Sequence, residues 1–222
     1  MRAFWRRALP PPTPGLIVLA DSLWREAAPG ALHVLTAELA ERHPAIWIEM
    51  PITRCLKAPG FGPRLKRSLR LELPAVRYVD GRRELDVATP PLLPPGNMVG
   101  DAMLAQTVDW LLRARRSSPR VLLLARRGPA ATALIERLKP AVSVDWHDDP
   151  APGDRWHPRA DLILWPAWAP VPEGEDAHDP RVLRLNEAGV RGIKRLVPMI
   201  EGWLRPTVWV GAEAAMAQDI LP

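Results

Sequence analysis

The chain has 222 residues, enough for one large domain or two small ones, and 47% of them are hydrophobic, which excludes a wholly disordered protein. Its single cysteine, Cys55, cannot form an internal disulfide, and the absence of Cys-x-x-Cys pairs and His-x-x-x-His spacing predicts no zinc site. The net charge of +5 is carried mostly by arginine, and both genomic base composition and an anionic partner remain open as its source.

Residues 1–14 form a basic, proline-rich arm. Met1 to Arg7 carry the charge of a signal sequence, but the prolines that follow interrupt any apolar segment. The apolar run at 15–20 is much too short to span a membrane. We therefore expect a cytoplasmic protein, in a reducing compartment.

Residues 15–50 contain the pattern of a βαβ unit. An apolar strand at 16–20 is followed by a helix at 31–42, where Leu32, Leu35 and Leu39 fall on one face, and then by a strand at 46–50. Such a unit has parallel strands and a right-handed connection. Because no Gly-x-Gly-x-x-Gly follows the first strand, the pattern disfavours NAD binding.

Residues 52–71 form a basic insertion between the strands. After Pro63, Leu65 and Leu69 would line one side of a helix that is surrounded by cations. The cations are Arg64, Lys66, Arg67 and Arg70. This pattern is typical of a helix on an anionic bilayer, but a solvated basic face over ordinary core leucines explains it equally simply.

Two short neighbouring strands are predicted at 75–80 and 85–89, followed by a proline-rich loop and a long helix at 98–115. The helical spacing predicts that Val99, Met103, Val108, Leu111 and Leu112 point inward. Trp110 is expected to belong to the core rather than to form a ligand platform. Asp101 lies favourably near the positive end of the helix dipole.

The remaining elements alternate between strands and helices. Strands are predicted at 121–125, 142–145, 161–165 and 182–185, with a helix at 130–138. A C-terminal tail at 190–222 contains helices at 190–204 and 212–220, with the apolar run 208–210 between them. The chain thus predicts an α/β fold with a doubly wound, mostly parallel, Rossmann-like sheet over 15–189, on which the tail packs.

The strand at 142–145 runs directly into a polar cluster of Asp145, His147, Asp148 and Asp149. In an open parallel sheet the ligand crevice lies at the carboxyl ends of the strands. Asp21, Ser22 and Gly30 follow the first strand in the same way. We therefore expect these two groups of residues to meet at one edge of the sheet.

Several segments in this order resemble the N-terminal, acceptor-side half of retaining GT-B glycosyltransferases, particularly bacterial enzymes of teichuronic-acid and exopolysaccharide biosynthesis. The matching segments are Leu19-Ala-Asp-Ser-Leu-Trp24, Ala31-Leu-His-Val-Leu-Thr-Ala-Glu-Leu-Ala-Glu-Arg42, Ile46-Trp-Ile-Glu-Met-Pro51, Val144-Asp-Trp-His-Asp-Asp149, Ala160-Asp-Leu-Ile-Leu164 and Arg184-Leu-Asn-Glu-Ala-Gly-Val190. The resemblance implies a single GT-B half with no bound cofactor and with a nucleotide sugar as donor substrate.

By this resemblance, His147 lies beside the transferred sugar, where an imidazole can donate a hydrogen bond or share a proton. Asp145 or Asp148 would then fix its tautomer, although a strand-end histidine held by an aspartate can also be purely structural. His33 matches the histidine on the family's first helix. Its position opposite Leu32 and Leu35 favours a surface histidine instead.

The donor half of a GT-B enzyme is missing from this sequence. That half carries two glutamates eight residues apart, and no two glutamates after residue 150 have this spacing. The resemblance therefore predicts an incomplete transferase in cell-surface polysaccharide biosynthesis. It would bind a donor-domain protein and a lipid-linked or polysaccharide acceptor, and it would lie at the inner face of an anionic membrane if the basic insertion binds lipid.

Two other functions remain open. The chain could be a non-catalytic module that binds carbohydrate or membrane. It could also bind nucleic acid, but its cations are distributed over several loops with few interleaved aromatics, and no recognisable nucleic-acid module is present.

Overall fold

A computed structural model describes residues 12–22, 24, 30–49, 75–80, 83–88, 98–126, 128–147, 149–151, 153–185 and 190–205. Several predictions fall outside these ranges. They are residues 1–11 of the arm predicted at 1–14, the basic insertion at 52–71 with Arg64, Lys66, Arg67 and Arg70, the site residue Asp148, the run 208–210 and the helix 212–220. The last residues of the predicted arm, from Thr13, belong instead to the first strand.

The described chain forms one eight-stranded sheet in the order β3-β4-β2-β1-β5-β6-β7-β8. The strands are β1 (Thr13–Leu19), β2 (Ala45–Ile48), β3 (Ala75–Asp80), β4 (Arg83–Ala88), β5 (Ser117–Leu124), β6 (Val142–Trp146), β7 (Leu162–Pro166) and β8 (Val182–Leu185). Seven of them are parallel, and β3 joins the edge antiparallel to β4. The predicted mostly parallel α/β sheet is confirmed.

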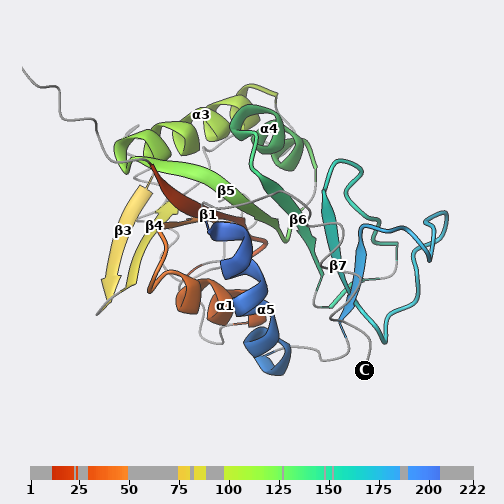
Figure 1. The fold of residues 1–222 in the computed structure, drawn as a ribbon. Helices are drawn as coiled ribbons and strands as arrows, with labels where there is room; N and C mark the ends of the chain where they lie inside the picture. The colour runs from red at the N-terminus through yellow and green to blue at the C-terminus, as the bar shows by residue number, and fades with distance from the viewer. Residues whose placement is uncertain are drawn as a thin grey trace, which may run out of the picture.

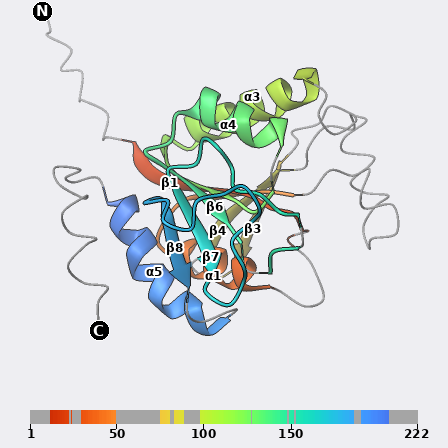
Figure 2. The ribbon, with the colours of Figure 1, turned by 90° about the vertical axis from the view of Figure 1, so that its right-hand side faces the viewer.

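Four helices cover the two faces of the sheet in the described chain. They are α1 (Ala31–Leu39), α3 (Met98–Ala114), α4 (Pro129–Leu138) and α5 (Val190–Leu204). Figure 1 shows α3 and α4 on one face and α1 and α5 on the other, and the turned view in Figure 2 shows the sheet between these layers. The sheet is therefore doubly wound, with α5 packed back on it as predicted.

Alternation along the strands builds a core on each face. In β1, Leu16 and Val18 face α1 and α5, whereas Ile17 and Leu19 face α3 and α4, and all four are fully buried. A strand buried on both faces needs a continuous apolar run, which explains the sequence of β1. A third, smaller cluster around Trp156 and Trp165 lies where the chain between β6 and β8 covers the sheet.

The structure differs from the predicted bounds at β5, which begins at Ser117 rather than at residue 121. Its first residues pair with the start of β1, and the register shifts between Gly15 and Leu16. Ser117, Ser118 and Pro119 resemble a loop in sequence because proline cannot donate to a sheet ladder. The local irregularity lets the pairing continue past Pro119.

The predicted inward face of α3 is wrong in part. Val99 is 63% exposed, Met103 is 41% exposed and Trp110, expected in the core, is 48% exposed. Val108, Leu111 and Leu112 are buried as predicted, and Leu104 and Ala105 join them on the inner side. Because α3 is apolar on two sides, the helical period alone could not decide which side faces the sheet.

The side chain of Asp161, just before β7, adds hydrogen bonds to β6 besides those between the two backbones. Its carboxylate accepts hydrogen bonds from the backbone N–H of Ser143 at 2.7 Å and from the Ser143 hydroxyl at 2.6 Å. Ser143 is buried, so removing the carboxylate takes away the acceptor of its backbone N–H and leaves its hydroxyl only the longer contact of 3.4 Å to the Arg159 carbonyl. We expect Asp161→Ala to lower the free energy of unfolding by about 2 kcal/mol in urea denaturation. Glu173→Ala, at an exposed position, is the control and should leave stability unchanged.

Candidate functional site

A pocket of about 240 Å³ opens at the carboxyl ends of the central strands. β1 connects through α1 to β2 on one side, while its other neighbour in the sheet is β5, so the order of the strands reverses between β1 and β5. Such a switch point is where open α/β sheets bind ligands. The residues that line the pocket are Asp21, Ser22, Gly30, Leu32, His33, Ala125, Trp146, His147, Asp149 and Asp154.

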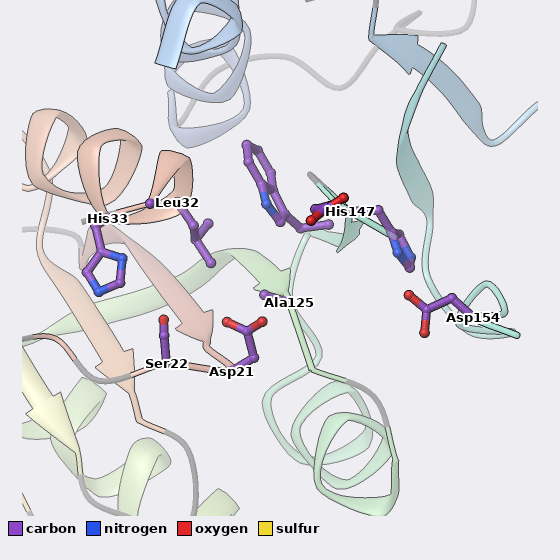
Figure 3. A pocket seen from close by; sticks show the side chains of 10 residues that line it. Asp21, Ser22, Leu32, His33, Ala125, His147 and Asp154 are labelled. Atoms are coloured by element: carbon purple, nitrogen blue, oxygen red, sulfur yellow. The ribbon is translucent and has the colours of Figure 1, made fainter. Parts of the chain in front are cut away.

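The pocket brings together residues from separate loops. Asp21 and Ser22 follow β1, Ala125 follows β5, and His147 follows β6. Figure 3 shows Asp21, Ser22 and His33 on one side of the pocket and His147 and Asp154 on the other, with Ala125 between them. Parallel strands deliver their carboxyl ends to a common edge, which accounts for this meeting of distant segments.

His147 is held by a buried aspartate at the end of β6. Its Nε2 atom lies 3.0 Å from Oδ2 of Asp145, and its ring lies 4.6 Å from the ring of Trp165. Because a carboxylate only accepts, the contact requires a hydrogen on Nε2. The contact therefore fixes both the tautomer and the orientation of a histidine that lines the pocket.

Asp145 lies beneath the pocket rather than in its wall. The residue is fully buried, and its Oδ2 atom also accepts the backbone N–H of His157 at 2.7 Å. It is absent from the pocket lining. We conclude that Asp145 positions His147 and does not contact a ligand in this pocket.

His33 is not the surface histidine that its helix position favours. Only 5% of it is exposed, and its ring packs at 4.5 Å from Trp47 and 5.7 Å from Trp24. Trp24 and Trp47 also contact each other edge to face. These aromatic partners, from the loop after β1 and from β2, bury the imidazole while leaving it in the pocket wall.

Two acidic residues that the sequence did not single out also shape this edge. Glu49, just after β2, accepts the backbone N–H of Trp24 at 3.2 Å and so ties the loop after β1 to the neighbouring strand. Asp154 lines the pocket from the loop after β6, and its carboxylate accepts the backbone N–H of Ala151. The position of Glu49 directly after a parallel strand is a signal that could have identified it, whereas no such signal marks Asp154.

The pocket wall is acidic. Asp21, Asp149 and Asp154 contribute carboxylates, and neither lysine nor arginine occurs among the described residues of the lining. The ranges that the structure describes contain no group of three or more His, Cys, Asp or Glu side chains arranged to hold a metal ion. The wall can accept several hydrogen bonds from a ligand, and it repels an anionic one.

Six of the predicted site residues thus line one pocket, namely Asp21, Ser22, Gly30, His33, His147 and Asp149. Asp145 lies below it, whereas Asp148 and the four cations of the basic insertion fall outside the described residues. This placement brings the residues together. The chemical role of each remains a prediction.

Comparison with protein families, curated proteins and solved structures found no match for this chain. Within the described ranges, no helix is both long and apolar enough to cross a membrane.

Proposed function

We propose that this chain is a glycosyltransferase-like protein of cell-surface polysaccharide biosynthesis whose pocket binds a sugar of the acceptor. The observation that carries the proposal is the combination of a switch-point pocket, an acidic wall and an oriented His147. The resemblance of the ordered segments to the acceptor-side half of GT-B glycosyltransferases supports the same proposal. The acceptor would be a polysaccharide or a lipid-linked sugar.

The polar lining favours a ligand that is rich in hydroxyl groups. Carboxylates of Asp21, Asp149 and Asp154 accept hydrogen bonds, and such charge-assisted bonds are stronger than neutral ones. A diphosphate would instead meet three like charges, and no cation, among the described residues of this wall. The pocket therefore suits a neutral sugar better than the leaving group of a nucleotide sugar.

His147 would assist the transfer from the acceptor side. The imidazole can take the proton of an attacking sugar hydroxyl, while Asp145 stabilises the imidazolium that forms. Such general-base assistance contributes about 10²–10⁴-fold to a rate. The larger share, neutralisation of the leaving diphosphate, would come from a donor-domain protein that brings the nucleotide sugar.

Sugar binding tests the proposal directly. Saturation-transfer NMR with a panel of neutral mono- and oligosaccharides should show binding to the full chain. Asp21→Asn should weaken it by roughly 10-fold or more, since a hydrogen bond to a charged group is lost. Asp176→Asn is the matched control, because Asp176 is exposed and absent from the pocket lining. Equal affinities of the two variants, or no binding of any sugar, would contradict the proposal.

Assays of sugar transfer distinguish a half-enzyme from a non-catalytic carbohydrate-binding module. The chain alone should not transfer sugar from a panel of nucleotide sugars to isoprenoid-linked acceptors at an enzymatic rate. A half-enzyme should gain activity with a donor-domain partner and lose it in His147→Ala, whereas a binding module should gain none. Transfer by the chain alone that His147→Ala abolishes would show that the chain is a complete enzyme.

A further inference from the structure

The α3 helix is apolar on two opposite sides. Its inner side packs Leu104, Val108 and Leu111 into the core. Its outer side exposes four large apolar residues. Among the described residues, the one other exposed large apolar side chain is that of Trp168. The four are Met98 (84% exposed), Val99 (63%), Met103 (41%) and Trp110 (48%). A helix that covers a sheet normally turns a polar side outward, so this outer side has the character of a buried surface.

We propose that the outer side of α3 is the interface of a homodimer, in which α3 packs antiparallel against α3 of a second copy. We call this surface the outer stripe and define it as Met98, Val99, Ala102, Met103, Gln106, Trp110 and Arg113, all exposed on one side of the helix. Figure 1 shows α3 at the edge of the molecule, on the face opposite α1 and α5. No residue of the outer stripe lines the pocket, so the dimer leaves the pocket residues outside the interface.

The outer stripe is complementary to itself about its centre. A twofold axis at Gln106 brings the two Gln106 side chains together, and an amide can donate to and accept from an identical amide. The same axis places Trp110 of one copy opposite Ala102 of the other. A large indole then meets a small side chain, which is the alternation that close helix packing requires.

The charges also favour the antiparallel arrangement with a second copy. The outer stripe carries no carboxylate and a single cation, Arg113, whose guanidinium is held by Asp109 at 2.9 Å. Antiparallel packing separates the two Arg113 residues by about 20 Å, with seven residues on each side of the axis at 1.5 Å per residue. Parallel packing would juxtapose them. Asp109 also binds Arg137, so Arg113 and Arg137 are already neutralised in part, and this weakens the case for an anionic bilayer as the occupant.

Sedimentation velocity of the full chain tests the interface. At micromolar concentration we expect a dimer, and Trp110→Glu should raise its dissociation constant by roughly 30-fold or more, as for a central aromatic anchor. Trp168→Glu is the matched control, since Trp168 is 57% exposed but lies after β7, and it should leave the dimer intact. Circular dichroism checks that both variants fold. A monomeric wild type, or equal dissociation by both variants, would overturn the proposal.

Disulfide trapping tests the register in a Cys55→Ser background. Helix axes 8–10 Å apart place the two facing Cα atoms at position 106 about 3.5–5.5 Å from each other, which reaches disulfide range. Gln106→Cys should therefore link to itself on oxidation, whereas Arg113→Cys should not. Self-linking at 113 but not at 106 would overturn the antiparallel register. Flotation of a monomeric wild type with anionic vesicles, lost in Trp110→Glu, would assign the outer stripe to a membrane instead.

Discussion

Replacing Trp47 with alanine is expected to lower the free energy of unfolding by about 3–5 kcal/mol, the range for large-to-small changes of a buried indole. Trp47 is fully buried in β2, in the core between the sheet and α1. It also contacts the rings of Trp24 and His33, so the loss would not be confined to the core. The loop after β1 should lose one of its supports, and sugar binding should weaken together with stability.

Chemical denaturation of Trp47→Ala and wild type measures the first effect, and sugar titration of the folded variant measures the second. Trp168→Ala provides a control of the same chemistry, because Trp168 is mostly exposed and such surface changes stay within about 0.5 kcal/mol. A Trp47→Ala protein as stable as Trp168→Ala would contradict the central place that we assign to this indole.

The sequence sufficed to predict the sheet and the edge at which the pocket lies. Asp21 and His147 are 126 residues apart in the sequence. Because parallel strands bring their carboxyl ends to the same edge of a sheet, both residues are expected at that edge even when no side-chain contact is known. The prediction depended only on recognising β1 and β6 as strands. Both consist of apolar residues over most of their length, which is the pattern of fully buried strands.

Side-chain environments that depend on tertiary partners could not be predicted. His33 occupies a helix position that suits a surface residue, and only the approach of Trp24 and Trp47 buries it. The outward direction of Trp110 was missed because both sides of α3 carry apolar residues at helical spacing. Asp154 was missed because its loop between β6 and β7 has no periodic pattern that positions it.

The link between fold and site is strongest at Asp145, where one carboxylate supports a backbone turn and a pocket histidine. Asp145→Ala removes the acceptor of two buried donors, the backbone N–H of His157 and Nε2–H of His147. An unsatisfied buried donor costs about 1–3 kcal/mol, so we expect the free energy of unfolding to fall by about 3 kcal/mol. Asp145→Asn retains one oxygen acceptor and should lose about half as much.

The same substitution should release the tautomer of His147. In wild type, ¹⁵N NMR of the imidazole is expected to show the proton on Nε2, and Asp145→Ala should shift the population towards Nδ1–H and weaken sugar binding. Asp149→Asn is the matched control, because Asp149 is an exposed residue of the pocket wall that should affect binding while leaving stability within about 0.5 kcal/mol. If Asp145→Ala keeps both the stability and the Nε2–H tautomer of wild type, the carboxylate neither supports the turn nor orients the histidine, and His147 loses its proposed role as an oriented base.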